Sequence, residues 1–216
     1  MPSRDFPGFA NYFSCGDINL KSTPLVTVSA WVWMDAFSGD QAGYLLQYGN
    51  ELLPHWFRDN LNFRTGGVDI GAGVVTPVGS WHHLVFRQAG TGGSDKQIFR
   101  NNAVVATGAG TNMGTSATTT LVGNNQGGAG TFDGRMCDLC VWNAALSNGE
   151  IDALYRRVRP LVVRPAAVKA YWPLRGNALP EPDLSGNGKN LAIAVGSVPA
   201  HIADPGLGPL VPVYGG

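Results

Sequence analysis

The sequence predicts an all-β fold, a sandwich of two antiparallel sheets with one short helix. Glycine accounts for 30 of the 216 residues and proline for 14, whereas only 14% of the residues are charged. Glycine supplies positive φ angles and proline pre-sets turn geometry, so this composition suits many short strands joined by tight turns. Because 44% of the residues are apolar, a disordered chain is not expected.

Apolar residues recur with a period of two in short runs, which is the pattern of β-strands. Within residues 26–32, Val26, Val28, Ala30 and Val32 alternate with polar and aromatic side chains. The two sets should therefore face opposite sides of a sheet. Many strands separated by glycine-rich turns are typical of a sandwich or barrel. We predict further strands at residues 8–15, 42–48, 53–58, 61–65, 80–88, 96–100, 102–107, 117–123, 131–143, 168–174 and 190–195.

One helix is predicted, at residues 148–156. Residues 147–150 (SNGE) have the capping-box pattern, in which the serine hydroxyl accepts a hydrogen bond from the amide three residues later and the glutamate reaches back to the serine amide. A short apolar stripe follows at Ile151, Leu154 and Tyr155. This stripe gives the helix one face to bury against the sandwich.

Several stretches resemble laminin G-like domains, which have the concanavalin A-like jelly-roll fold. Residues 80–86 (SWHHLVF) resemble the central strand of that family. Residues 132–155 (FDGRMCDLCVWNAALSNGEIDALY) resemble its closing strand and short helix, and this is the most specific match. Its opening strands are resembled by residues 9–13 (FANYF), 26–32 (VTVSAWV) and 43–47 (GYLLQ). The resemblance implies a jelly-roll module that acts by binding.

A further part of the family pattern comes at an unusual place in the chain. Residues 171–174 (YWPL) and 183–188 (DLSGNG) resemble the strand and turn with which such a domain normally begins. The chain is either a circular permutant, in which residues 168–200 supply a strand to the main sandwich, or it carries the stump of a second module. Too few residues follow for a second sandwich, so we favour permutation and expect the aromatic pair of YWPL to be buried. The predicted organisation is one domain over residues 1–200 and a Pro/Gly-rich tail over residues 201–216.

No catalytic constellation is visible, so an enzyme is not expected. Glucanases of the resembled fold carry carboxylates in the pattern Glu-x-Asp-x-x-Glu, because glycoside hydrolysis needs a carboxylate pair at a fixed separation. Three glutamates are present, and none lies in that pattern: Glu51, Glu150 and Glu181. His82 and His83 point to opposite faces of their predicted strand. We therefore expect one of them in the core and the other exposed, rather than both in one site.

The resemblance implies a structural calcium ion as a candidate cofactor, and no other cofactor is expected. Related domains often hold one Ca²⁺ ion through Asp and backbone oxygens in loops. Asp183 and Asn187 of the DLSGNG turn are hard oxygen donors of the right type, and Asp138 matches an acidic position of the family. The alternative is that such side chains only stabilise turns through local hydrogen bonds.

The three cysteines are an odd number, which excludes a complete disulfide framework. On a regular strand Cys137 and Cys140 point to opposite faces, and we interpret both as buried, reduced residues. A disulfide between Cys15 and either of them is left open, for the case that the first and closing strands are neighbours.

Two tryptophans are the candidate ligand-binding residues. Trp31 and Trp33 lie two residues apart on the same face of their predicted strand. Exposed aromatic pairs stack on sugar rings or anchor protein interfaces. The alternative is that a loop or the permuted segment covers both side chains, since tryptophan is highly buried on average.

The composition restricts the partners of the protein. The formal net charge is zero, which argues against a general nucleic-acid partner, and no stretch of 18 apolar residues predicts a membrane span. No secretory signal is recognised at the start of the sequence.

We therefore expect a non-catalytic structural module of a homo-oligomeric or larger assembly, located in a virion as a phage surface or capsid-decoration protein. Its partners would be capsid or tail subunits, bound by the apolar, proline-rich tail. The alternative for the tail is that it lies along its own sandwich, over Trp33. The alternative is an extracellular, lectin-like module that binds a glycan, for example in host recognition.

Overall fold

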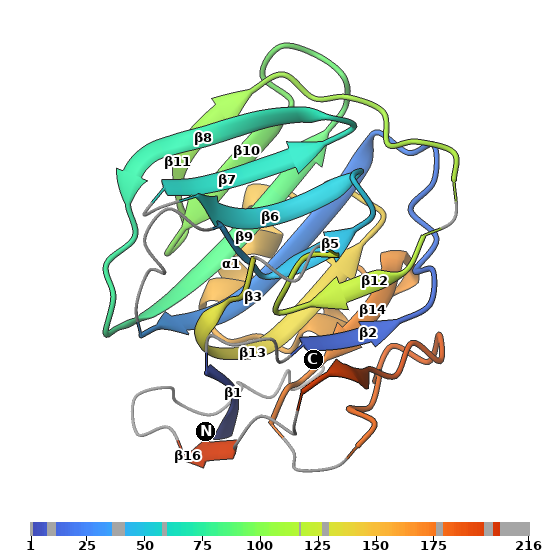
Figure 1. The fold of residues 1–216 in the computed structure, drawn as a ribbon. Helices are drawn as coiled ribbons and strands as arrows, with labels where there is room; N and C mark the ends of the chain where they lie inside the picture. The colour runs from blue at the N-terminus through green and yellow to red at the C-terminus, as the bar shows by residue number, and fades with distance from the viewer. Residues whose placement is uncertain are drawn as a thin grey trace, which may run out of the picture.

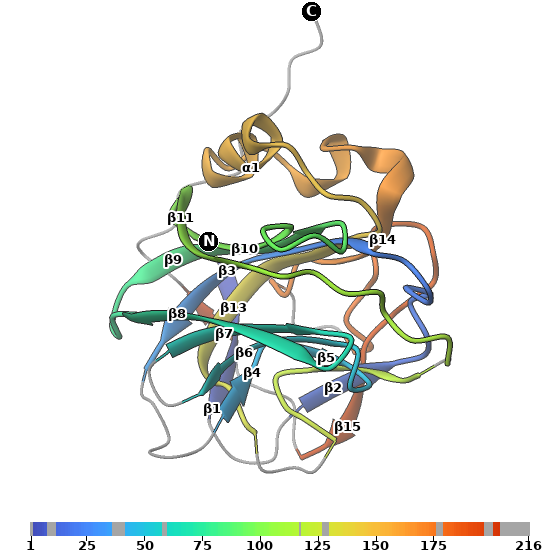
Figure 2. The same ribbon diagram turned by 90° about the horizontal axis from the view of Figure 1, so that it is seen from above.

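The computed structural model describes residues 2–7, 12–35, 42–57, 60–116, 118–126, 130–175, 179–196 and 201–203. They form two antiparallel sheets stacked face to face, with one helix on the outside of the sandwich (Figures 1 and 2). This is the all-β jelly-roll sandwich that the sequence predicts. No helix in the described part of the chain is long and apolar enough to cross a membrane.

The first sheet, here called sheet A, carries the helix on its outer face (Figure 2). Its strands follow the spatial order β11 (Ala103–Gly108), β10 (Lys96–Arg100), β9 (Trp81–Ala89), β3 (Leu25–Met34), β13 (Asp133–Trp142), β1 (Pro2–Pro7) and β16 (His201–Ala203), with β14 (Val168–Trp172) also paired to β13. The second sheet, sheet B, follows the order β15 (Ala192–Val195), β2 (Tyr12–Cys15), β12 (Thr120–Val122), β5 (Leu46–Tyr48), β6 (Leu52–Phe57), β7 (Asn60–Thr65) and β8 (Val68–Val75), with β4 (Ala42–Tyr44) also paired to β6.

Each predicted strand has a counterpart in the structure, although the predicted run at residues 42–48 is divided into β4 and β5. Only the second half of the predicted strand at residues 8–15 is described, as β2. Three strands were not predicted. They are β1, β8 and β16.

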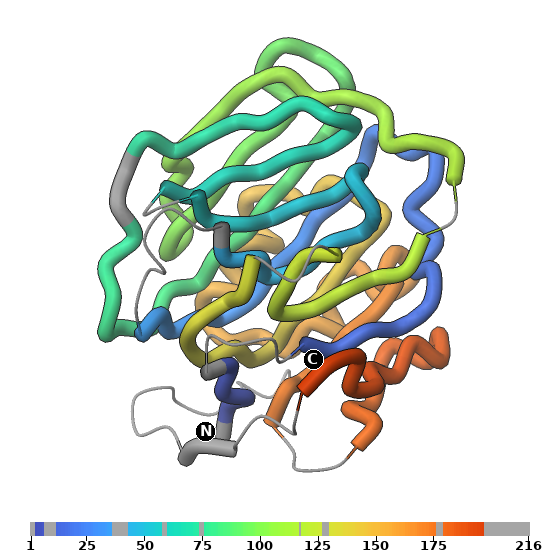
Figure 3. The backbone as a smooth tube through the Cα atoms, in the orientation of Figure 1, coloured from blue at the N-terminus to red at the C-terminus, as the bar shows by residue number. Residues whose placement is uncertain are grey.

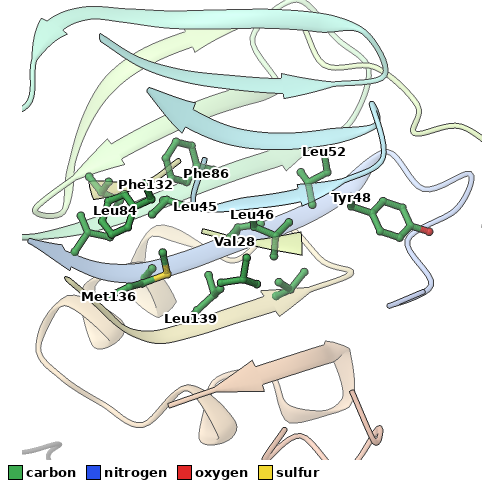
Figure 4. Close-up of a cluster of buried hydrophobic side chains, with 14 of the residues drawn as sticks. Val28, Leu45, Leu46, Tyr48, Leu52, Leu84, Phe86, Phe132, Met136 and Leu139 are labelled. Atoms are coloured by element: carbon green, nitrogen blue, oxygen red, sulfur yellow. The ribbon is translucent and has the colours of Figure 1, made fainter. Parts of the chain in front are cut away.

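The main core fills the space between the two sheets. Val26, Val28, Ala30 and Val32 are all buried in it, as the alternation in this strand predicts. Figure 4 shows side chains of both sheets meeting there, with Val28 of sheet A and Leu46 of sheet B on facing strands. Burial of this apolar surface is the main term that holds the two sheets together.

A second apolar cluster lies on the outer face of sheet A, beneath α1 (Asn148–Tyr155). The helix begins at the capping box that the sequence predicts: the Ser147 hydroxyl accepts a hydrogen bond from the Glu150 amide, and the Glu150 carboxylate accepts one from the Ser147 amide. Its apolar residues pack over the sheet with Trp142, whose indole N–H donates to the carbonyl of Val163. Sheet A is therefore covered on both faces where the helix lies.

The closing strand β13 contains a bulge that changes the faces of its cysteines. Asp138 has φ 54°, and the register with β3 shifts between Cys137 and Cys140. Cys137 pairs with Trp31 and Cys140 with Ser29, so both thiols point to the outer face. The expectation of opposite faces was wrong, because the extra residue of a bulge shifts the alternation by one. Both cysteines are buried and reduced as predicted, and burial raises the pKa of Cys137 to about 12.

The disulfide that the sequence left open does not form. Cys15 lies on β2 in sheet B, whereas the other two cysteines lie on β13 in sheet A. All three cysteines are free. This disulfide requires the first and closing strands to be neighbours. Strands β2 and β13 belong to different sheets, so they are not.

The C-terminal segment completes the sandwich. Strand β14 pairs with β13, and Tyr171 and Trp172 are buried, as permutation predicts. Farther along the chain, β15 pairs with β2 (Figure 3), and β16 pairs with β1. The predicted tail at residues 201–216 thus begins with three residues of paired strand, while residues 204–216 lie outside the described residues.

Candidate functional site

Trp31 and Trp33 lie on the outer face of sheet A, as predicted, but their surroundings differ. The Tyr155 ring stacks nearly parallel to that of Trp31, with a centroid separation of 6.0 Å. The Arg157 guanidinium lies 5.0 Å from the Trp31 ring centroid. Among the described residues, the last residue of α1 and the turn that follows it therefore cover Trp31. This leaves little of its ring for a ligand.

His83 lies beneath this aromatic group. Its ring centroid is 5.1 Å from that of Trp31, and its Nε2 lies 2.9 Å from the Ser29 hydroxyl oxygen. Only 1% of His83 is exposed, and His82 on the opposite face is also buried. The expectation that one of the two histidines is exposed was wrong, because α1 and Arg157 cover the outer face of the sheet at this point.

Buried His83 is expected to make the protein sensitive to acid. Burial, with a smaller contribution from Arg157, lowers the pKa of His83 to about 3. In the unfolded chain the pKa of this histidine is about 6.5. Between about pH 6.5 and about pH 3 the unfolded chain therefore binds a proton that the folded chain does not. The free energy of unfolding falls as the pH falls through this range. From about pH 7.5 to pH 5, wild type should lose about 2 kcal/mol more unfolding free energy than His83→Gln. Urea denaturation at the two pH values measures this, and equal losses in both proteins would contradict it.

Trp33 lies beyond the helix and is half-buried. The edge of the Trp81 ring meets it at a centroid separation of 6.1 Å, and the Arg135 guanidinium lies 5.2 Å from its ring centroid. The Trp33 indole N–H donates to Asp35 over 2.9 Å. The two predicted tryptophans therefore do not form one joint stacking surface.

The predicted calcium ligand Asp138 is engaged by other side chains. One of its oxygens accepts a hydrogen bond from the Tyr171 hydroxyl at 2.8 Å. The other accepts from Arg157 at 3.2 Å and also from Arg175. Asp138 is buried, so these contacts compensate for the buried charge of the β13 bulge.

The other two predicted ligands stabilise the DLSGNG turn. Asp183 accepts hydrogen bonds from the backbone amides of Tyr171, Ser185 and Lys189 at 2.9–3.0 Å. The Asn187 side chain donates to the carbonyl of Val168. Within the described residues, no group of three or more His, Cys, Asp or Glu side chains is placed to hold a metal ion. Calcium binding at Asp138, Asp183 and Asn187 stays a prediction, which melting with added calcium would test.

A cavity of about 240 Å³ opens on the outer face of sheet B. Strands β2, β12 and β5, which lie side by side in Figure 1, form its floor together with β15. Its lining residues are Tyr12, Ser14, Gln47, Gly49, Thr118, Thr119, Leu121, Gln126 and Ala194. We call it the sheet B cavity.

The strand alternation places the floor of the sheet B cavity. On β2, Phe13 is buried in the core, so its neighbours Tyr12 and Ser14 point outward into the cavity. Gln47 is only 5% exposed, and its amide group joins two loops at the cavity wall. The side-chain N–H₂ donates to the carbonyl of Gly49 at 2.9 Å, and the side-chain oxygen accepts from the Gln126 amide at 2.5 Å.

The remaining polar groups of the cavity are available to a ligand. The hydroxyls of Tyr12, Ser14, Thr118 and Thr119 make no hydrogen bond to another described residue, and neither does the side-chain amide of Gln126. Hydroxyls and amides both donate and accept hydrogen bonds. Together with the phenol ring of Tyr12 and the apolar side chain of Leu121, they suit a small molecule that has several hydroxyl groups and one apolar face.

Sequence reasoning missed the sheet B cavity. Its residues come from four strands and three loops that are far apart in the chain. A usable signal was present at residues 12–14, where an aromatic residue and a serine flank a core phenylalanine. That pattern predicts an outward-facing tyrosine, although it does not predict what lies beside it.

Comparison with known proteins gives a family match over most of the chain. The model of the family described as "Concanavalin A-like lectin/glucanases superfamily" matches residues 7–152. A search of curated protein sequences finds no match.

Several solved structures share the fold at low sequence identity. A protein from Bacteroides ovatus described as carbohydrate binding has a TM-score of 0.67 and 18% identity over 94% of this chain, which spans 61% of that protein's length. A heptameric SAP-like pentraxin from Limulus polyphemus has a TM-score of 0.55 and 18% identity, covering 89% of this chain and 94% of the pentraxin. Domain 4 of AbnA, a GH43 extracellular arabinanase from Geobacillus stearothermophilus, was solved with arabinotriose. It has a TM-score of 0.51 and 16% identity, covering 64% of this chain and 69% of that domain. At these identities the similarity shows the fold alone.

Proposed function

This chain belongs to the concanavalin A-like lectin/glucanases superfamily, and we propose that it is a non-catalytic module that binds carbohydrate in the sheet B cavity. The observation that carries this proposal is the lining of the cavity. Tyr12 offers a ring beside a set of hydroxyl and amide groups that have no hydrogen-bond partner among the described residues. Sugars present hydroxyl edges and apolar C–H faces, and this combination of groups is complementary to both.

The structural neighbours support the carbohydrate hypothesis. One of them is described as carbohydrate binding, and another was solved in complex with arabinotriose. They favour the glycan alternative of the sequence analysis over its main hypothesis. A module that binds glycans would act outside the cell, and we propose an extracellular location for it.

The positions of the glutamates support a non-catalytic role. Glu150 caps α1 and binds Arg164, Glu181 binds Arg4, and Glu51 accepts the amide of Gly114. The described lining residues of the sheet B cavity include no carboxylate. Hydrolysis of a glycosidic bond by the usual route needs two carboxyl groups about 5–10 Å apart across that bond.

The assembly hypothesis stays a prediction. It depended on the tail at residues 201–216, most of which lies outside the described residues. A role as a virion surface or capsid-decoration protein has no support from the solved structures named above. Sizing of the chain with and without residues 205–216 would test it, since unchanged assembly size would leave the tail without an intersubunit role.

Tyr12→Ala is expected to weaken glycan binding about tenfold, because it removes both the contact area of the aromatic ring and its stacking contribution of about 0.5–1.5 kcal/mol. A glycan array identifies the bound saccharide, and calorimetric titration then compares dissociation constants. Tyr12→Phe should retain most of the affinity, because it keeps the ring. The matched control is Trp33→Ala on sheet A, which should bind like wild type. If Trp33→Ala abolishes binding while Tyr12→Ala does not, the site lies on sheet A and the proposal for the cavity is wrong.

A further inference from the structure

The described residues that line the sheet B cavity carry no ionic side chain. None of its lining residues is Asp, Glu, His, Lys or Arg. Three stretches outside the described residues adjoin lining residues in the sequence, and none contains a charged residue type: residues 8–11 are GFAN, residue 117 is Ala and residues 127–129 are GGA. Elsewhere on the same sheet a charged pair is present, Arg64 with Asp69.

The absence of charge decides which ligands the cavity can accept. A carboxylate or ammonium group that leaves water without an ionic partner loses hydration energy that neutral hydrogen bonds only partly replace. An acidic sugar would need an Arg or Lys side chain in the lining, and an amino sugar would need a carboxylate. A metal-bridged sugar would also need carboxylate ligands, because Ca²⁺ is held mainly by Asp and Glu oxygens.

We infer that the ligand of the sheet B cavity is an uncharged saccharide, bound by direct hydrogen bonds and without a bridging cation. This inference rests on the proposed function and specifies its ligand class. Gln47 supports it, because both ends of its amide are already held by Gly49 and Gln126. The amide therefore fixes the wall of the cavity, while the neutral hydroxyls and the exposed Gln126 side chain contact the ligand.

The test uses saccharide pairs that differ mainly in charge: galactotriose against trigalacturonate, and the N-acetylglucosamine trimer against the glucosamine trimer. In each pair in which binding is detected, the neutral member should bind at least about tenfold more tightly, a difference of about 1.4 kcal/mol. Binding of the neutral member should be the same in EDTA as in calcium chloride. It should also change less than about threefold between low and high salt, because screening acts only on charges.

Two variants of Gln126 make the test specific to this site. The side chain is exposed at the rim of the cavity, so a charge there should not disturb folding. Gln126→Lys should tighten binding of trigalacturonate about tenfold, while Gln126→Glu should not. Thr91→Lys, at an exposed turn between β9 and β10, adds the same charge at a remote position. It should leave all affinities unchanged.

The outcomes separate this inference from the proposed function. If a charged member binds as tightly as its neutral partner, or if EDTA abolishes binding, and Tyr12→Ala still removes that binding, the inference is overturned while the carbohydrate site stands. If no saccharide on the array or in the pairs binds, the proposed function and the inference both fail. A preference for neutral members that Gln126→Lys relaxes and Thr91→Lys does not supports both.

Discussion

Removal of residues 168–216 is expected to leave a chain that does not fold cooperatively. The deleted segment supplies β14, which pairs with β13 in the middle of sheet A, and β15, which pairs with β2 in sheet B. The deletion also removes Trp172 from the core between the sheets and Tyr171 from the cluster beneath the helix. Full burial of one large apolar side chain contributes about 1.5–3 kcal/mol. The loss of several such side chains is comparable to the roughly 5–15 kcal/mol by which domains are typically stable.

Urea denaturation followed by circular dichroism measures this effect. The control is a chain lacking only residues 205–216, which keeps all three C-terminal strands and should unfold cooperatively. A milder variant, Trp172→Ala, should fold but lose about 3–5 kcal/mol of stability, because it leaves a cavity in the core. A soluble fragment of residues 1–160 with a cooperative transition would show that the rest of the sandwich folds without the C-terminal segment, and the permutation hypothesis would fall with it.

Local patterns predicted most strands because each has one buried face. The run at residues 26–32 shows this, since its apolar set is also its core set. Strand β8 was missed because Gly71 and Gly73 interrupt its alternation. Strand β1 was missed because it is bounded by prolines and contains Arg4, a residue type that is rarely buried. The buried guanidinium pairs with Glu181, a partner 177 residues away that no local pattern reveals.

The outer face of sheet A could not be predicted from strand patterns alone. The sequence predicts α1 correctly, but not which residues of the sheet it covers. His83 is buried because Tyr155 and Arg157 end up above it. The bulge at Asp138 is equally hidden from the sequence, because it is defined by the pairing of β13 with β3. One inserted residue reverses the facing of all that follow.

The candidate site was the least predictable part of the molecule. Tryptophans are obvious candidates for binding residues in a sequence. The sequence predicts correctly that Trp31 and Trp33 share a face, but Tyr155 of α1 covers Trp31. The sheet B cavity is built from serine, threonine and glutamine, which on their own look like ordinary polar positions of strands and turns. Their significance comes from long-range pairing of β2 with β12 and of β12 with β5.

Arg4→Met is expected to destabilise the protein by about 3–5 kcal/mol, because it leaves a buried carboxylate without its counter-ion. Arg4 is 0% exposed and its guanidinium donates to Glu181 over 2.6 Å, while the other oxygen of Glu181 accepts the amide of Leu174 at 2.8 Å. The pair therefore joins the N-terminal strand β1 to the segment that follows β14. A buried charge pair that loses one partner costs more than one that loses both. The double variant Arg4→Met with Glu181→Gln should accordingly be more stable than Arg4→Met alone, since the glutamine oxygen can still accept the amide of Leu174.

Chemical denaturation of the wild type and the single and double variants gives the coupling between the two positions. The matched control is Arg156→Met, which removes an arginine from a pair of similar distance, 2.7 Å to Asp152, but with 74% of the arginine side chain exposed. Solvent screens such a pair, so the melting temperature of this control should equal that of wild type.

If Arg4→Met is as stable as Arg156→Met, the buried pair does not fix β1 to the C-terminal segment. The Arg4 guanidinium carbon also lies 5.5 Å from the centroid of the Phe13 ring. If the double variant is less stable than Arg4→Met, the stability lost in Arg4→Met comes from this packing and not from the unpaired charge of Glu181.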